Sequence, residues 1–339
     1  MIKVKIEMNK RNGKAATIND VARLSGVTNI TVSRVFNSPE KVKPETRSLV
    51  MRMADYLHYV PNALAQGTKN NASRIIGIVT DDTFNAVYSY VINALCLISE
   101  KKGYSVMIFT TQGSRDSEAK ALNTLVGYKA AGIVLSVVDD SPDYDTSHIR
   151  NIEKSSTRLI QFDREYDSQL PGVFIDNLQA GERVAEVINA RGFTSLLIIG
   201  GKQSSRITRQ RIAGITANIA PGVAVEVLYA DYRYENARAT IARHFAQRQG
   251  NYQCIVGING PITLGAISVA TALNLKGLAF ISIDAIPHAE DFNIFYPCVV
   301  HDYQHWAATV AENMMSAIEQ QDYEARVFMP GKLKNFDWE

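Results

Sequence analysis

The spacing of apolar residues divides the chain into two regions. Between residues 17 and 59 apolar side chains recur every three or four positions, which predicts three short helices. From residue 75 onward, short runs rich in Val, Ile and Leu alternate with amphipathic stretches of helical length. Apolar strands separated by helices predict parallel β-sheets that are covered on both faces. The strand candidates are Ile75–Val79, Ser105–Phe109, Gly132–Leu135, Leu159–Phe162, Val173–Ile175, Leu196–Ile199, Val225–Leu228, Cys254–Val256 and Phe280–Ile283.

The number of predicted strands indicates two lobes. A sheet usually holds about five or six strands, and residues 75–339 offer more than that. We therefore expect two similar α/β lobes with a ligand cleft between them. Residues 62–74 are polar and are interpreted as a hinge, and residues 1–16 as a flexible leader. The predicted domains are thus 17–61, which is helical, and 75–339, which is α/β and ends in a strand-like, aromatic segment.

Helix signals in residues 17–61 predict a helix-turn-helix. Thr17 precedes a helical run, and Gly26 supplies the tight turn that ends it. Thr28 caps a second helix, Asn29 to Phe36, and a third begins near Pro44, a residue suited to a first turn. In this motif the second helix enters the major groove of DNA. The residues expected to form its core are Val27, Val32, Val35, Leu49, Val50, Met53 and Leu57.

Charge is distributed unevenly along the chain. Residues 1–74 carry 13 Lys and Arg against 5 Asp and Glu, and the remainder carries 23 against 29, although the formal net charge is +2. A basic N-terminal unit fits contact with DNA phosphates. Cys96, Cys254 and Cys298 lie far apart with no CxxC motif, so we predict neither disulfides nor a metal site. Without an export signal or a long apolar run, we expect a cytoplasmic protein with no membrane contact and no cofactor.

Three segments of the first region carry a family resemblance. They are Thr17–Thr28 (TINDVARLSGVT), Thr31–Asn37 (TVSRVFN) and Tyr59–Ala63 (YVPNA), and they resemble the headpiece of the LacI/GalR family of bacterial repressors. The resemblance implies base contacts by Asn29, Ile30 and Arg34. It also implies contacts with the phosphate backbone by Thr17, Thr28, Thr31, Ser33, Asn37 and Thr46. The competing interpretation is that these hydroxyls only cap helices and that Ile30 is an incidental exposed side chain.

The hinge departs from the family pattern. In the family this segment forms a helix, paired across the dimer, that wedges a leucine into the minor groove, and Asn62, Ala63 and Ala65 fit that pattern. The leucine position holds Thr68, whose single methyl group makes a poor wedge. We therefore expect a less sharply kinked operator. A helix shifted in register, with Leu64 as the wedge, is the alternative.

The resemblance extends over the α/β region and implies a two-lobed effector domain like the periplasmic sugar-binding proteins. Four polar positions match the effector-site pattern: Asp163, Arg211, Asn259 and Asp284. Val87, Tyr88, Phe174 and Tyr303 are expected to form the walls of the site. Carboxylates and an arginine fork suit a ligand with several hydroxyls. Apart from the family resemblance, the alternative interpretation is structural: an Asp after a strand is often a helix cap, and a helical Arg is often a surface group.

Two substitutions distinguish this site from the family pattern. Gly260 after Asn259 and Ala285 after Asp284 stand where acidic residues are common, so the C-terminal half offers fewer acceptors. Four basic residues gather in a short segment: Lys202, Arg206, Arg209 and Arg211. They favour an anionic effector such as a sugar phosphate or sugar acid. A solvated basic helix face is the alternative.

The combined features predict a regulator that binds operator DNA and a small-molecule effector. We expect a repressor of a carbohydrate-utilisation operon and a homodimer without a coiled-coil tetramer, because no leucine heptads follow Arg326. The alternatives are a solute-binding protein of a sugar transporter and a sugar-binding enzyme. A transporter's solute-binding protein would need an export signal and would have no use for a helix-turn-helix. Against an enzyme, the six histidines show neither the spacing of metal ligands nor that of a nucleophile and its base.

Overall fold

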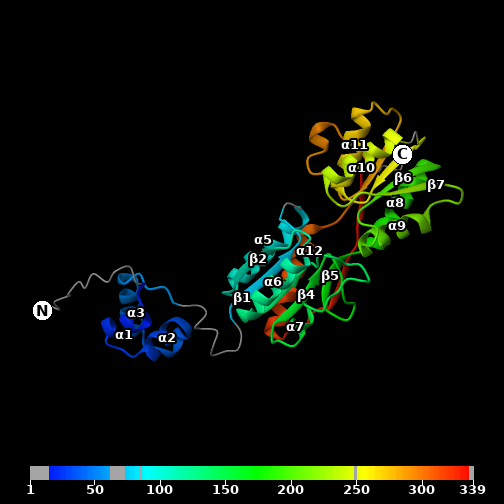
Figure 1. Ribbon diagram of the computed structural model, residues 1–339. Coiled ribbons are helices and arrows are strands. Elements are labelled where there is room, and N and C mark those ends of the chain that lie inside the picture. The colour runs from blue at the N-terminus through cyan, green and yellow to red at the C-terminus, as the bar shows by residue number, and fades with distance from the viewer. Residues whose placement is uncertain (1–14, 62–72, 84–85, 248–249, 336–339) are drawn as a thin grey trace. The chain divides into compact units, whose positions relative to one another are not determined.

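The computed structural model describes residues 15–61, 73–83, 86–247 and 250–335. The chain separates into two compact units (Figure 1), Met1–Ser73 and Arg74–Glu339. We call them the headpiece and the two-lobed unit and describe each by itself.

The described part of the headpiece forms a helix-turn-helix with a third helix. Its elements are α1 (Ile18–Ser25), α2 (Asn29–Asn37), the 3-10 turn η1 (Pro39–Lys41) and α3 (Pro44–Tyr56). Gly26 ends α1 with a φ of 65°, a left-handed conformation that glycine adopts without a steric penalty. The hydroxyl of Thr28 accepts a hydrogen bond from the Thr31 N–H at 3.2 Å and caps α2. The helix-turn-helix predicted from these signals is confirmed.

A small apolar core holds the three helices together. Val21, Val32 and Val50, one from each helix, are fully buried. Val27 packs against this cluster as predicted. Leu49 does not belong to it and is partly exposed, because its neighbour Val50 takes the inward-facing position on α3.

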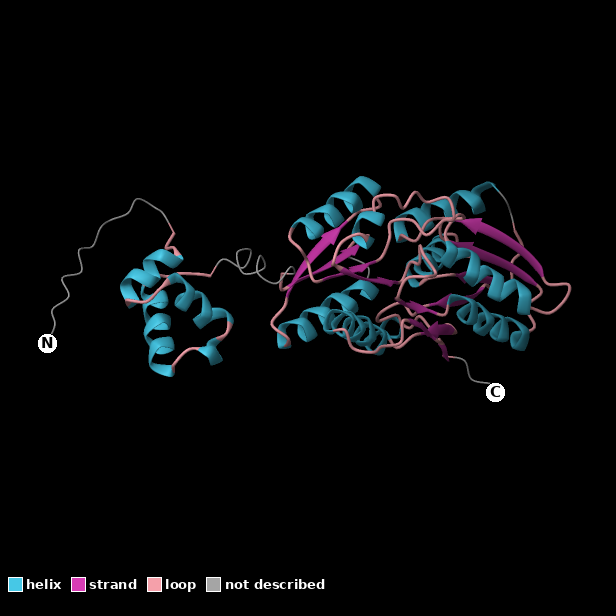
Figure 2. Cartoon of the chain, turned by 90° about the horizontal axis from the view of Figure 1, so that it is seen from below, coloured by secondary structure: helices cyan, strands magenta, loops and turns pink. Residues whose placement is uncertain are grey.

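The two-lobed unit contains two six-stranded sheets with helices on their faces (Figure 2). The sheet of the N lobe has the parallel order β11-β5-β4-β3-β1-β2. Its strands are β1 (Ile75–Thr80), β2 (Ser105–Thr110), β3 (Gly132–Leu135), β4 (Arg158–Phe162), β5 (Gly172–Ile175) and β11 (Arg326–Met329). Its helices are α5 (Ala86–Lys101), α6 (Arg115–Gly127), α7 (Arg150–Glu153) and α12 (Tyr303–Glu319).

Both faces of the N-lobe sheet are buried. Ile76 and Ile78 of β1 join the apolar cluster formed with α5 and α12, whereas Ile75 and Val79 join the cluster formed with α6 and α7. Successive side chains of a strand point to opposite faces, so a strand covered on both sides must be apolar throughout. This is the reason that the strands were recognisable as continuous apolar runs.

The C lobe repeats the same strand order. Its sheet runs β12-β10-β9-β8-β6-β7, parallel except for β12, which is antiparallel to β10. The strands are β6 (Ser195–Gly200), β7 (Ala224–Tyr229), β8 (Cys254–Gly257), β9 (Ala279–Ile283), β10 (Cys298–Val300) and β12 (Lys332–Lys334). The helices are α8 (Asn177–Arg191), α9 (Arg206–Asn218), α10 (Tyr234–Gln247), α11 (Gly260–Ala272) and the short η2 (Glu290–Phe292).

The chain passes between the lobes three times, after β5, after β10 and after β11. All nine predicted strands are present, and the two-lobed architecture is confirmed. The short strand β10 was not predicted, because its three residues give no recognisable pattern. Among the described residues no helix is long and apolar enough to cross a membrane.

Candidate functional site

The residues predicted to read DNA bases lie on the outer face of α2. Ile30 is 59% exposed, and Asn29 and Arg34 are exposed as well, whereas Val32 and Val35 of the same helix are buried. The Asn29 amide donates to the side-chain oxygen of Asn19 on α1. The exposed face of α2 therefore presents an amide, an apolar group and a guanidinium together, a combination that suits base edges in the major groove.

The predicted phosphate contacts surround this face. The Thr28 and Thr31 hydroxyls lie 3.0 Å apart, and the Asn37 amide donates to the Ser33 hydroxyl at 3.1 Å. The hydroxyl of Thr17 donates to Asp20 at 2.7 Å at the start of α1. Thr46 on α3 is half-buried. Thr28 is thus both a cap and an exposed hydroxyl, so the capping and phosphate-binding interpretations do not exclude each other at this position.

The predicted hinge residues Asn62, Ala63, Ala65 and Thr68 lie outside the described residues. Their roles remain predictions from the sequence.

Polar side chains of the two-lobed unit gather where the strands end. Asp163 follows β4 and accepts a hydrogen bond from the Tyr88 hydroxyl of α5 at 2.7 Å. Burial raises the pKa of the Asp163 carboxyl group, although Arg164 beside it acts in the opposite direction. Burial also raises the pKa of Tyr88 well above its ordinary value, so its hydroxyl remains a donor. Carboxyl ends of parallel strands are the usual place for ligands in α/β folds.

Arg211 is the central cation of the C-lobe side. It projects from α9, is 6% exposed, and donates to the Asn177 amide oxygen at 2.8 Å, to the Ile258 carbonyl and to Asp284 at 3.3 Å. Burial by itself disfavours the charged guanidinium, but Asp284 together with Tyr303, Tyr232 and Asp163 offsets this and raises the Arg211 pKa. The interpretation of Arg211 as a solvated surface group is therefore wrong.

Asp284, after β9, forms the counterpart of Asp163. It accepts hydrogen bonds from the Tyr303 hydroxyl and, at 3.3 Å, from the ring of His301. Burial alone would raise its pKa, but the Arg211 charge and these donors hold the pKa of Asp284 well below its ordinary value. The structure therefore brings Arg211, Asp284 and Tyr303 into one hydrogen-bonded group.

Asn259 has the capping role that its position after a strand allows. Its side-chain oxygen accepts from the Ile262 N–H at 2.8 Å at the start of α11, and its amide donates to the Tyr232 carbonyl at 3.1 Å. Its amide oxygen and nitrogen thus both have partners within the protein. A ligand contact by Asn259 would have to share or replace these bonds.

The predicted wall residues do not line one common cavity. Phe174, 2% exposed, lines a small cavity between the lobes together with Asp163 and Asn177. Val87 instead packs against the apolar core of the N lobe. The cavity measures only about 10 Å³, and neither Arg211 nor Asp284 lines it.

The basic segment at the start of α9 does not form one patch. Lys202 and Arg209 are exposed, whereas Arg206 pairs with Glu165 at 2.9 Å and Arg211 pairs with Asp284. Two of the four cations thus have carboxylate partners, so the segment by itself gives weak support for an anionic effector.

Comparison with known families identifies the chain. The model of bacterial regulatory proteins of the lacI family matches residues 17–62. The model of periplasmic binding proteins and the sugar-binding domain of the LacI family matches residues 73–327. The chain belongs to the LacI family.

Relatives of this LacI-family protein are transcriptional repressors. The HTH-type transcriptional repressor PurR of Vibrio campbellii is 26% identical over 321 residues, which cover 92% of this chain and 95% of that protein. The sucrose operon repressor of Streptococcus mutans is 31% identical over 193 residues, 56% of this chain and 57% of that protein. As a member of the same family, the present chain is a transcription regulator.

A solved structure shares the fold over nearly the whole chain. The lac repressor dimer bound to operator and the anti-inducer ONPF matches with a TM-score of 0.79 at 19% identity, covering 94% of this chain and 98% of that chain. The sequence identity is too low to transfer the roles of individual residues. The structural match agrees with the two-lobed architecture.

Two residues near the candidate site of this LacI-family protein, Arg164 and Tyr232, were not predicted from the sequence. The Arg164 side chain is 12% exposed, and it donates to the carbonyls of Val137 and Val138 at 3.2 and 2.8 Å. Its guanidinium lies 6.0 Å from the ring centre of Tyr232, which comes from the C lobe. The sequence signal that could have indicated Arg164 is its position directly after Asp163. No sequence signal indicated Tyr232, because it lies in a loop without periodic apolar residues.

Proposed function

We propose that this LacI-family regulator represses a carbohydrate-utilisation operon and that a sugar, sugar acid or sugar phosphate bound between its lobes controls operator affinity. The observation that carries the proposal is the pair of carboxylates at strand ends, Asp163 and Asp284, each with a tyrosine donor and with Arg211 on α9 beside Asp284. Carboxylates accept from adjacent hydroxyls of a sugar, and a guanidinium binds hydroxyl pairs or an anionic group.

Operator recognition is proposed for the exposed face of α2. Asn29, Ile30 and Arg34 would read bases, and the hydroxyls around them would position the helix on the phosphates. The excess of basic residues in positions 1–74 supports this assignment, because counterion release from DNA provides most of the sequence-independent affinity.

A ligand screen tests the effector proposal. Thermal shifts are measured with neutral sugars, sugar acids and sugar phosphates, and each ligand that stabilises the protein is tested for operator release in a gel shift. Arg211→Ala should abolish both the shift and the release. Arg209→Ala removes an exposed arginine from the same helix and should leave both intact. Equal behaviour of the two variants, or no shift with any of the three ligand classes, would contradict the proposal.

We also propose that the regulator acts as a homodimer. A single headpiece buries little surface on DNA, and palindromic operators match a twofold protein. The loop between β9 and β10 supports self-association, because it carries Phe292 and Phe295, which are 74% and 67% exposed. Large apolar side chains that gather on a surface mark contact sites for other chains.

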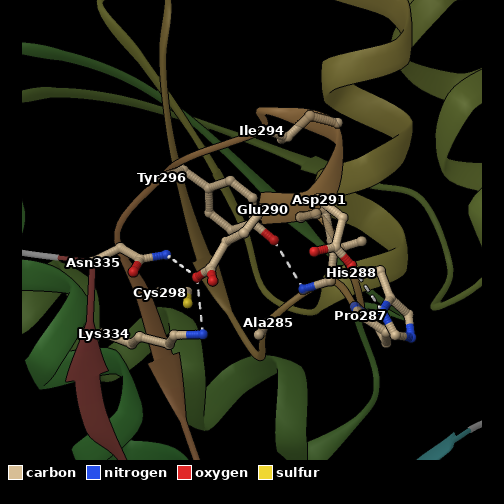
Figure 3. A pocket seen from close by; sticks show the side chains of 12 residues that line it. Ala285, Pro287, His288, Glu290, Asp291, Ile294, Tyr296, Cys298, Lys334 and Asn335 are labelled. Carbon is tan, nitrogen blue, oxygen red and sulfur yellow. Dashed lines mark hydrogen bonds and ion pairs between the residues drawn. The ribbon is translucent and has the colours of Figure 1, made fainter.

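A pocket lies beside the same loop. It measures about 290 Å³ and is bounded by the 285–296 segment on one side and by Lys334 and Asn335 on the other (Figure 3). Glu290 and Lys334, both about half exposed, pair across it at 2.9 Å. In the proposed dimer, Phe292 and Phe295 of each copy enter the pocket of the other across a twofold axis, because an interface of this symmetry uses the same surface on both copies.

A further inference from the structure

The first turn of α9 is capped by a residue of the other lobe. Ser205 is the N-cap residue of α9, but its side chain accepts no hydrogen bond from the helix. The Ile207 N–H instead donates to a carboxylate oxygen of Asp140 at 3.1 Å, and the Ser205 hydroxyl donates to the same oxygen at 3.2 Å. Asp140 follows β3 of the N lobe, and all three residues are buried. A carboxylate here meets both the unpaired N–H groups and the positive end of the helix.

The loop that carries Asp140 is fixed within the N lobe. Glu118 of α6 is fully buried and accepts from the Val138 N–H at 2.7 Å and from the Tyr144 hydroxyl at 2.7 Å. The ring of His148 lies 2.6 Å from the same carboxylate. Because these bonds hold the loop against α6, Asp140 cannot follow the C lobe when the lobes separate.

A chain of hydroxyls connects the cap to the candidate effector site. The Ser205 oxygen accepts from the Tyr232 hydroxyl at 2.6 Å, and the Tyr232 oxygen lies 2.7 Å from the Thr208 hydroxyl. Each hydroxyl has one hydrogen to donate, so the bonds run in one direction, from Thr208 through Tyr232 and Ser205 to Asp140. The Tyr232 ring in turn faces Arg164, the neighbour of Asp163.

A second contact between the lobes lies on the same helical turn. Arg206 pairs with Glu165 at 2.9 Å, and Glu165 also accepts from Arg326 at 2.6 Å. The start of α9 therefore meets one N-lobe carboxylate through its backbone and another through a side chain. Both contacts require closed lobes.

We propose that Asp140 is an interlobe cap that stabilises the closed arrangement of the two-lobed unit. The proposal rests on the effector control proposed above. The cavity of about 10 Å³ beside Asp140 and Asp163 cannot admit a sugar, so a ligand can enter only after the lobes part and α9 loses its cap. The closed form thus competes with ligand entry, and Asp140 sets the fraction of molecules that are open.

Hydrogen–deuterium exchange of the full-length protein, without DNA or ligand, tests the cap. Asp140→Ala removes the acceptor, and we expect amides in residues 205–210 and, across the cleft, in residues 161–167 to exchange about fivefold to tenfold faster. Asp140→Asn keeps an acceptor oxygen and should remain within about twofold of wild type. Asp143→Ala removes an exposed carboxylate from the same loop and should change neither segment.

Three results would overturn the proposal: unchanged exchange in Asp140→Ala, faster exchange in residues 205–210 alone, or equal effects of Asp140→Ala and Asp143→Ala. If Asp140→Ala fails to fold, Ser205→Ala provides a partial form of the test, because it removes one of the two donors to Asp140 and leaves the Ile207 N–H bond and the loop intact. A smaller increase in exchange is then expected in both segments, and no increase would overturn the proposal. Operator binding of the wild-type protein is measured separately by gel shift. A protein that does not bind an operator but shows the expected exchange would contradict the proposed function and not the interlobe cap.

Discussion

Asp163 and Asp284 occupy similar backbone positions but differ in their electrostatics. Each follows a strand, and each has a positive φ, 59° and 69°. Burial dominates at Asp163 and raises its pKa, whereas Arg211 and the neighbouring donors lower the pKa of Asp284. The charged form of Asp163 therefore costs stability at neutral pH, and this cost disappears as the pH falls through its raised pKa. The charged form of Asp284 contributes stability above its ordinary pKa of 3.8, and this contribution is lost as the pH falls below it.

This difference predicts opposite effects of the same substitution. At pH 7, Asp163→Asn should raise the free energy of unfolding by about 1 kcal/mol, because it removes a buried charge while keeping an acceptor for Tyr88. Asp284→Asn should lower it by about 1–3 kcal/mol, because it leaves the Arg211 charge buried without its partner. Asparagine tolerates a positive φ, so backbone strain does not separate the two variants.

Urea unfolding followed by tryptophan fluorescence measures both changes, because the buried Trp306 becomes exposed on unfolding. The gap between the variants should narrow as the pH falls toward 4. Changes of the same sign at pH 7 would show that the two carboxylates are not in the opposite environments described here.

The helices and strands that have a clear local pattern could be predicted from the sequence. The helix α2 was recognisable from its cap Thr28 and from buried valines at helical spacing, and the strands from apolar runs buried on both faces. The contact between Asp140 and Ser205 joins residues that are 65 positions apart, and nothing in the local pattern marks it. Side chains that meet only when two lobes close could not be paired from one sequence. The candidate effector residues could be predicted from the family resemblance, but their contacts join residues that lie far apart in the chain.

The hinge provides a prediction at the scale of elements. Residues 62–72 lie outside the described residues, and the sequence has Thr68 at the position where the family has leucine. Thr68→Leu should tighten operator binding and increase bending in a circular-permutation assay, because an apolar wedge helps to offset the cost of unstacking a base step. Leu64→Ala is the control and should leave bending unchanged. Strong bending by the wild type that Leu64→Ala abolishes would mean that the hinge helix is shifted in register.

At the scale of the whole molecule, the exposed aromatic residues of the C lobe predict the strength of the dimer. The double substitution Phe292→Ser and Phe295→Ser should raise the dimer dissociation constant at least about tenfold, because it removes the side chains proposed to fill the partner's pocket. Leu178→Ser removes an apolar side chain that is 46% exposed on α8 of the same lobe and should have little effect. Sedimentation velocity over a range of protein concentrations gives the dimer dissociation constant of each variant. A tetramer at micromolar concentration, or equal weakening by both changes, would contradict this interface.

We propose that the exposed face of α2 makes this protein a sequence-specific operator-binding regulator. Selection of binding sites from random duplex DNA by the full-length protein tests it most directly. We predict that the wild type enriches an inverted repeat, that Arg34→Ala enriches no sequence, and that changes at Asn29 or Ile30 enrich a repeat with altered bases. Arg52→Ala, on the exposed surface of α3, should enrich the wild-type repeat. The claim would be contradicted if the wild type enriched no repeat, or if Arg34→Ala enriched the same repeat as the wild type.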